Sequence, residues 1–209
     1  MIDRFQRMLR SLVPFMLALA LFAAAAPAHE GEVTDKPRAL TFDDLISLGR
    51  IGAFEVSPDG KTIAFAVTWF DRDKNSSKTD IYTVGAYGGD PEPFIAGDCN
   101  NTSPCWSPDG GRLAYLAMSR PGFEADRFRV VVREWASGQE RSLDLRADDS
   151  PCGDRSPGSI GWSADGRELL LTADHVGQHP VFALDVATGK ARLVVKEGQS
   201  ASPQPAGPG

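Results

Sequence analysis

Short apolar runs follow polar turns of one kind along most of this chain. The turn is Ser-x-Asp-Gly, and its copies lie at residues 57–60, 107–110 and 163–166. The apolar run after each copy lies at residues 63–67, 113–117 and 169–171. Runs of this length bounded by turn residues are typical of strands, so the pattern predicts an all-β fold.

The turn also repeats at a regular interval. Ser57, Ser107 and Ser163 are 50 and 56 residues apart. A repeat of roughly 40–50 residues built from short strands is the mark of a β-propeller blade. We therefore predict a partial β-propeller of three four-stranded blades, of the TolB or WD type. The expected blades are residues 51–97, 98–148 and 149–197.

The first blade illustrates the strands and loops that we expect in each repeat. They lie at residues 62–68, 80–84 and 92–96, with a polar loop at residues 71–78. In the leader, residues 29–50, Thr41 and Asp44 form a capping pair that predicts a short helix, with a simple turn as the alternative. Residues 198–209 carry no strand pattern, and we interpret them as a tail or as the start of a missing blade.

The repeated turns supply the residues that we single out as structural. An Asp side chain in such a turn can accept backbone N–H groups, and Gly tolerates the exit conformation. These residues are Ser57, Asp59, Gly60, Ser107, Asp109, Gly110, Ser163, Asp165 and Gly166. Trp106 and Trp162 precede the second and third turns directly, so we expect both in the core between blades.

The N-terminus has the pattern of an export signal. Arg4, Arg7 and Arg10 precede a mostly apolar stretch at residues 12–26, which is shorter than a membrane span. We predict a signal peptide at residues 1–28, cleaved after Ala28, and a periplasmic or secreted protein without a membrane segment after cleavage. An uncleaved anchor is the alternative.

Charge and cysteine content narrow the chemistry further. The net charge is −6, and no basic run follows the N-terminal segment, which argues against a nucleic-acid partner. In an oxidising compartment Cys99 could form a disulfide with Cys105 or with Cys152, and three unpaired thiols are the alternative.

Tests for catalytic and metal-binding patterns give no site. Ser159 lies beside Gly158 and not in a Gly-x-Ser-x-Gly elbow. His175 and His179 have the spacing of a zinc helix, but Gly177 and Pro180 place them in a loop. We therefore predict no catalytic, cofactor-binding or metal-binding residue, and no cofactor.

Four motifs give the chain a family resemblance. They are residues 40–45, Leu-Thr-Phe-Asp-Asp-Leu; residues 57–61, Ser-Pro-Asp-Gly-Lys; residues 80–82, Asp-Ile-Tyr, followed by Gly88 and Gly89; and residues 106–110, Trp-Ser-Pro-Asp-Gly. Residues 40–195 thus resemble the N-terminal propeller of the prolyl oligopeptidase family, in its dipeptidyl aminopeptidase and acylaminoacyl-peptidase-like branch. The Trp-Ser-Pro-Asp-Gly turn is also shared with TolB-type propellers.

The resemblance implies a non-catalytic part of an exported serine peptidase. In that family the propeller covers an α/β-hydrolase domain, admits short peptides, and holds none of the catalytic residues. We expect a chain truncated before that domain, whose partners are the missing blades and the hydrolase domain, or a second copy. We also expect the chain alone to be inactive, and the intact parent to bind peptides. The alternative is a TolB-like periplasmic scaffold that binds proteins.

Overall fold

The computed structural model describes residues 38–145 and 155–205 of the chain. Residues 41–209 form one compact unit, distinct from residues 1–40, and the description below concerns the former. The predicted signal peptide at residues 1–28 lies outside the described residues. No helix of the described ranges is long and apolar enough to cross a membrane.

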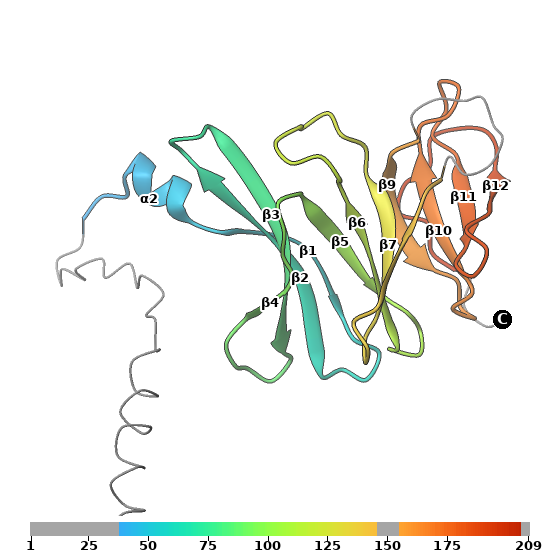
Figure 1. Cartoon of the computed structure of the whole chain (residues 1–209), viewed down its shortest axis with the longest axis horizontal. Helices are drawn as coiled ribbons and strands as arrows, with labels where there is room; N and C mark the ends of the chain where they lie inside the picture. Colours follow the sequence, from blue (N-terminus) through green and yellow to red (C-terminus); the bar gives the residue numbers. More distant parts are fainter. Residues whose placement is uncertain (1–37, 146–154, 206–209) are drawn as a thin grey trace, which may run out of the picture. The chain divides into compact units, whose positions relative to one another are not determined.

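Three four-stranded antiparallel sheets make up this unit (Figure 1). In each sheet the strands neighbour one another in chain order, so each sheet is a meander. The strands are β1 (Arg50–Val56), β2 (Thr62–Asp71), β3 (Ser76–Gly85) and β4 (Glu92–Ile95) in blade one; β5 (Asn101–Trp106), β6 (Arg112–Ala117), β7 (Arg129–Glu134) and β8 (Glu140–Leu143) in blade two; and β9 (Pro157–Trp162), β10 (Glu168–Ala173), β11 (Val181–Asp185) and β12 (Ala191–Val195) in blade three. The predicted fold class is confirmed.

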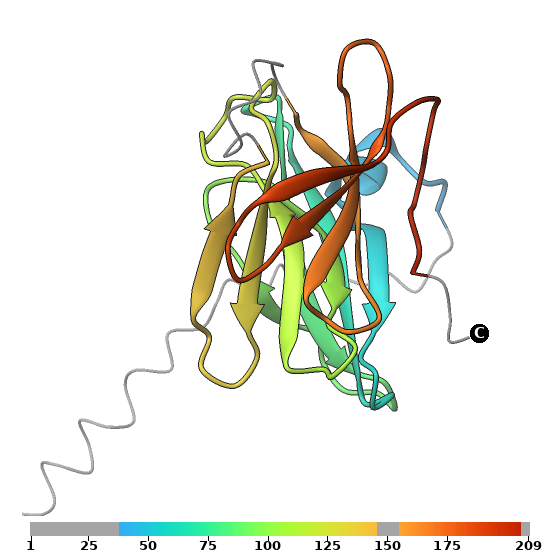
Figure 2. The same ribbon diagram turned by 90° about the vertical axis from the view of Figure 1, so that its right-hand side faces the viewer.

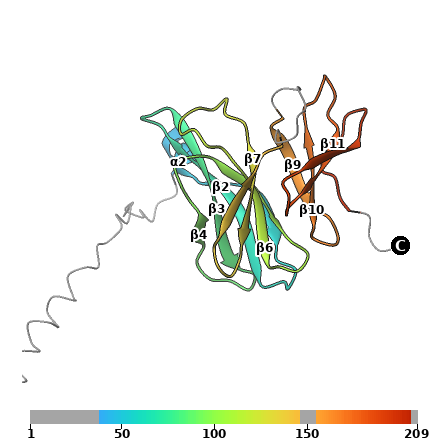
Figure 3. The same ribbon diagram turned by 45° about the vertical axis from the view of Figure 1, so that its right-hand side comes forward.

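The first strand of each sheet contacts the first strand of the next, β1 with β5 and β5 with β9. We call β1, β5 and β9 the inner strands. In Figure 3, β9 lies on the side of its sheet that is nearer to β7. In Figure 2 the β9–β12 sheet is the one nearest to the viewer. Successive sheets therefore contact one another through their inner strands and through the sheet faces that extend from those strands.

The apolar core lies between successive sheets. Leu116, Val130 and Leu143 of blade two pack with Leu171 and Phe182 of blade three in one buried cluster. Two smaller clusters join blades one and two. Since one face of each blade is buried by its neighbour, the blades are stabilised mainly by their stacking.

The two tryptophans before the turns lie in this core, as predicted. Trp106 is 5% exposed and packs with Ala64 of blade one. Trp162 is 4% exposed and donates its indole N–H to the Cys105 carbonyl, at 3.0 Å. Val56 holds the same position in blade one and is 45% exposed, because no described sheet covers that side.

The predicted helix is present as α2 (Phe42–Ser47). The Thr41 side chain accepts the Asp44 N–H, and the Asp44 carboxylate accepts the Thr41 N–H at 2.8 Å. This capping box satisfies two donors that a helix start would leave without partners. None of the helix residues is buried.

The first hairpin is longer than the sequence predicted. Half of the expected loop at residues 71–78 is strand, and only residues 72–75 form the turn, because β2 and β3 pair without interruption from Thr62 opposite Gly85 to Asp71 opposite Ser76. The Thr68 and Thr79 hydroxyls bond across the two strands at 2.9 Å. The polar residues thus form an exposed end of the hairpin, where solvent tolerates side chains that a buried strand would exclude.

Replacing Ser107 tests how much a repeated turn contributes to stability. Its side chain is buried, donates to Asp109 and accepts the Arg112 N–H at 2.9 Å. Ser107→Ala removes the side-chain acceptor of the Arg112 N–H and one donor to Asp109, so we expect a loss of about 1–3 kcal/mol in the free energy of unfolding. Urea unfolding measures it, with the exposed Ser77→Ala as control. Equal stability of the two variants would contradict the turn's role.

Candidate functional site

The residues singled out from the sequence lie in three turns of one geometry. In each turn the Ser hydroxyl donates to the Asp carboxylate, at 2.7 Å for Ser57, 2.5 Å for Ser107 and 2.7 Å for Ser163. The Gly N–H donates to the Ser carbonyl, and the Gly φ is 70°, 69° and 66° in Gly60, Gly110 and Gly166. A left-handed φ favours glycine, which explains its place at the turn exit.

The turn carboxylates are held in the ionised form. In each turn the Ser hydroxyl is the main group that lowers the pKa of the Asp below its usual value, and the backbone N–H two residues after the Asp is the second. This holds for Asp59, Asp109 and Asp165. Because these carboxylates already accept local donors, they serve the turns and offer little to a ligand.

Of the three cysteines, the structure describes Cys99 and Cys105. Both are free thiols, so a bond between them is not formed. Cys105 is buried on β5 and faces Glu55 of blade one, with 3.9 Å between Sγ and Oε1. Burial is the main cause that raises the pKa of the Cys105 thiol to about 12, and the negative charge of Glu55 is the second. Cys152 lies outside the described residues.

The other residues tested from the sequence have structural contacts. The Ser159 hydroxyl bonds the Thr172 hydroxyl across β9 and β10, at 2.8 Å. The His175 ring meets Phe182 edge-on, and His179 Nδ1 lies 2.6 Å from the Ser200 carbonyl oxygen. No group of three or more candidate metal ligands occurs in the described ranges.

The inner strands enclose a hollow of about 400 Å³, which we call the inner hollow. Blade one contributes Phe54 and Glu55, and β5 and β9 contribute their last residues before the turns. Residues Gln204 and Pro205, which follow blade three, complete the lining. The lining mixes apolar residues such as Phe54 and Ile160 with polar ones, which are Glu55, Ser103, Ser159 and Gln204. The hollow is therefore suited to groups that combine an apolar part with a hydrogen-bond donor.

Glu55 is the polar group of the inner hollow that the sequence analysis missed. It is half-buried, and its Oε2 accepts the backbone N–H of Trp106 in blade two. Burial raises the pKa of the Glu55 carboxyl, while the Trp106 N–H and the Cys105 thiol oppose the rise. The signal that could have found it is the repeat itself, because Glu55, Cys105 and Gly161 each stand two residues before a turn serine.

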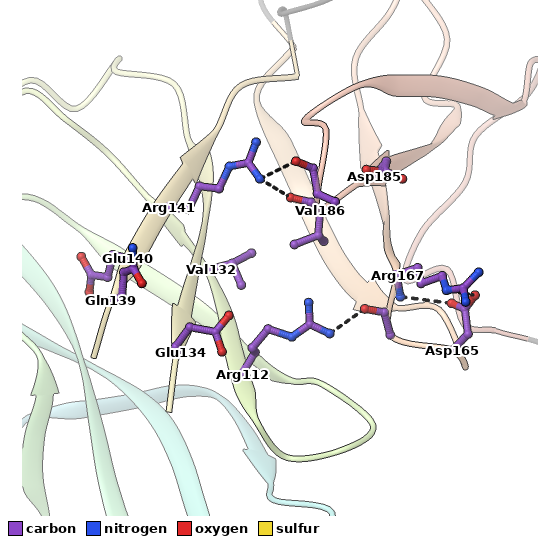
Figure 4. A pocket seen from close by; sticks show the side chains of 12 residues that line it. Arg112, Val132, Glu134, Gln139, Glu140, Arg141, Asp165, Arg167, Asp185 and Val186 are labelled. Carbon is purple, nitrogen blue, oxygen red and sulfur yellow. Dashed lines mark hydrogen bonds and ion pairs between the residues drawn. The ribbon is translucent and has the colours of Figure 1, made fainter. Parts of the chain in front are cut away.

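A second cavity, of about 590 Å³, lies between blades two and three and is shown in Figure 4; we call it the inter-blade cavity. Arg141 crosses from β8 and donates to the carbonyls of Val186 and Ala187, at 2.8 and 2.6 Å. Arg112 donates to the Gly166 carbonyl at 2.7 Å. The two guanidiniums thus join the blades through backbone groups.

Arg112 also stacks on the tryptophan of the next blade. Its guanidinium carbon lies 4.6 Å from the centre of the Trp162 ring. Glu134, Glu140, Asp165 and Asp185 line the same cavity, so its charges are mixed. Because both arginines already bind protein groups, the inter-blade cavity is a joint between sheets.

Replacing Glu55 tests the effect of its raised pKa. A carboxyl whose pKa is raised in the folded state, here from 4.5, stabilises the fold below its unfolded pKa and loses that contribution as pH rises through the folded pKa. Gln keeps an acceptor for Trp106 and cannot ionise. We therefore expect Glu55→Gln to unfold at higher urea than the unmodified chain at about pH 7, with a smaller difference at about pH 4.

Urea unfolding at both pH values measures this difference, and Glu92→Gln, an exposed change on β4, is the control. A difference for Glu55→Gln that is the same at both pH values, or that grows toward the lower pH, would contradict the effect of burial on this carboxyl.

No family model matches the chain. Among curated proteins it is 35% identical over 147 residues to dipeptidyl-peptidase 5 of Arthroderma otae, a match that covers 65% of this chain and 20% of that protein. It is 28% identical over 167 residues to dipeptidyl-peptidase 5 of Porphyromonas endodontalis, covering 78% and 22%. The chain thus spans about a fifth of the length of the curated relatives it matches.

Solved structures give the same fold. TolB from Acinetobacter baumannii has a TM-score of 0.53 at 18% identity, and covers 72% of this chain and 33% of its own. The β-propeller domain of the Trilobed protease from Pyrococcus furiosus gives 0.52 at 15%, covering 71% and 43%. Pyrococcus horikoshii acylaminoacyl peptidase gives 0.53 at 14%, covering 73% and 26%.

At these identities the structural neighbours establish the fold alone, whereas the sequence relatives are peptidases. The chain therefore has a partial β-propeller that resembles the propeller part of dipeptidyl- and acylaminoacyl-peptidases of the prolyl oligopeptidase type.

Proposed function

We propose that this chain is the non-catalytic propeller part of an exported serine peptidase that acts on peptides, and that it gates access to the catalytic domain. The observation that carries the proposal is the 35% identity with a dipeptidyl-peptidase over 147 residues, which covers 65% of this chain. Among the residues tested above, the Ser159 hydroxyl bonds Thr172, His179 lies against the Ser200 carbonyl, and the turn aspartates accept their own Ser hydroxyls. Hydrolysis is therefore assigned to the part of such peptidases that lies outside these blades.

The inner hollow supports a gating role physically. It lies along the inner strands, where β1, β5 and β9 approach one another. A passage bounded by packed sheets excludes folded proteins by size and admits an extended peptide. The walls include Phe54 and Ile160, which offer apolar contact to peptide side chains, and polar residues, among them Glu55 and Gln204, which offer hydrogen bonds.

A chimera tests the gating role. The segment of Porphyromonas endodontalis dipeptidyl-peptidase 5 that matches this chain is replaced by residues 41–197. We expect the chimera to cleave dipeptidyl p-nitroanilides and to leave a folded protein substrate intact, because the blades restore the passage. Circular dichroism and the parent enzyme are the controls. A folded chimera that cleaves folded proteins as fast as peptides would contradict gating.

TolB-like scaffolding is the second candidate, and the TM-score of 0.53 with TolB supports it. A scaffold binds its partner on the outside of the sheets and needs no passage for peptides. The same chimera separates the two functions: if it folds but leaves dipeptidyl substrates uncleaved, while purified residues 29–209 bind an envelope protein, scaffolding is favoured.

Export is the remaining part of the proposal, and it rests on the sequence of residues 1–28. Fusion of residues 1–40 to alkaline phosphatase tests it, because that enzyme needs disulfides that form outside the cytoplasm. We expect phosphatase activity, and we expect it to be lost when Arg4, Arg7 and Arg10 are replaced by Glu. Activity that stays in the cytoplasmic fraction, or none, would contradict export.

A further inference from the structure

Three segments of the chain carry the acceptor pattern of N-glycosylation, Asn-x-Ser/Thr with x other than proline. They begin at Asn75, Asn100 and Asn101. The bacterial transferases that use this pattern also require an acidic residue two positions before the Asn, which a cationic group of the enzyme can bind. Asp73 and Asp98 meet that condition for Asn75 and Asn100. Two complete acceptor patterns are therefore present, and the structure distinguishes them.

The first pattern lies at the exposed end of the hairpin in blade one. β2 and β3 have 10 residues each, whereas β6 and β10 have 6, so this hairpin is about 13 Å longer than those of the other blades. All residues from Asp73 to Ser77 are exposed. Figure 1 shows the end of this hairpin near α2. An enzyme can therefore reach residues 73–77 without opening a sheet.

The side chain of Asn75 is available for reaction. Its φ is 47°, a left-handed conformation that Asn tolerates, and its N–H donates to the Arg72 carbonyl at 3.2 Å. Among the described residues, none bonds the Asn75 carboxamide or the Ser77 hydroxyl. Ser77 pairs with Phe70 next to the last pair of the ladder, where local opening of strands costs least.

The side chains of the other two asparagines hold the fold together. Asn100 Oδ1 accepts the Thr79 N–H at 2.9 Å, and Asn100 Nδ2 lies 3.6 Å from the Met118 sulfur. Asn101 is 8% exposed and donates to the Cys99 carbonyl at 3.1 Å. Either carboxamide would have to lose these bonds before it could reach a sugar donor, and that loss costs free energy.

The surroundings of Asn75 suit an attached sugar. Asn75 lines a hollow of about 260 Å³ together with Phe42 and Phe70, and Phe42 is 64% exposed. The C–H face of a sugar ring removes apolar surface from water when it lies against an aromatic ring. A sugar on Asn75 is therefore expected to cover part of this aromatic surface. The inner hollow is lined by other segments, so the sugar leaves the passage of peptides open.

We propose that Asn75 is an N-glycosylation site, and that its sugar donor is an oligosaccharide on a polyprenyl pyrophosphate. In the transfer, Asn75 Nδ2 forms a bond to C1 of the first sugar, and the bond from C1 to the pyrophosphate oxygen breaks. The polyprenyl pyrophosphate leaves with the bonding electrons, and Nδ2 loses one proton. In cells the site depends on the proposed export of the chain, because such transfer takes place outside the cytoplasm.

Transfer to the purified full chain tests the site without depending on export. The chain is incubated with a purified bacterial oligosaccharyltransferase and a polyprenyl-linked oligosaccharide of known mass. Intact mass spectrometry should show the gain of one oligosaccharide, located on residues 73–77. Asn75→Gln, Ser77→Ala and Asp73→Asn should each abolish the gain. Asn100→Asp is the matched control, since it keeps the acceptor for the Thr79 N–H and should retain the gain.

Two free peptides show whether the fold makes the selection. Residues 71–79 and 96–104 should both accept the oligosaccharide as peptides, because each contains a complete acceptor pattern, whereas in the folded chain only Asn75 should. Transfer to Asn100 of the folded chain, or no transfer to the folded chain, would overturn the proposal. Transfer in vitro together with an inactive phosphatase fusion of residues 1–40 would support the acceptor site and contradict export alone.

Discussion

Burial of one sheet face by the next sheet is the constraint on which the rest of this structure depends. Each four-stranded meander has an apolar face that it cannot cover alone, and the neighbouring blade covers it. The comparison of Trp106 and Trp162 with Val56 shows the effect, since one repeat position is buried in two blades and half-exposed in the first. The order of the blades therefore decides the environment of each side chain as much as its own sheet does.

Polar groups between the sheets fix how the faces meet. Apolar contact alone has little direction, whereas Glu55 binds one N–H of the next inner strand and Arg141 binds two carbonyls. Such charge-assisted bonds to backbone groups set the distance and angle between blades without depending on the neighbour's side chains. The sequence of the neighbour can then vary while the joint is kept.

Local features of this fold could be predicted from the sequence, and contacts between distant residues could not. The Ser-x-Asp-Gly turns, the capping pair Thr41 and Asp44, and the burial of Trp106 follow from local patterns or from the repeat. The hairpin of β2 and β3 was predicted too short because its exposed end is polar and resembles a loop. Glu55 and Arg112 act across 50 or more residues, and nothing beside them in the sequence marks their partners.

The same difference between local patterns and contacts of distant residues applies to the candidate site. The sequence could be searched directly for a Gly-x-Ser-x-Gly motif, which it lacks, whereas the inner hollow arises only when three inner strands come together. His179 illustrates the point: its spacing from His175 suggested a metal site to be tested, and its use as a clamp for Ser200 depends on the path of the chain after β12.

The contact between Arg112 and Trp162 has an optical consequence. The indole is buried, its N–H is bonded across the joint, and a guanidinium lies on its ring, so its emission depends on blade two being in place. If blades two and three separated while each kept its own ladder, this fluorophore would enter water and its spectrum would shift to the red. The chain thus contains an intrinsic reporter of joint opening, distinct from the loss of secondary structure.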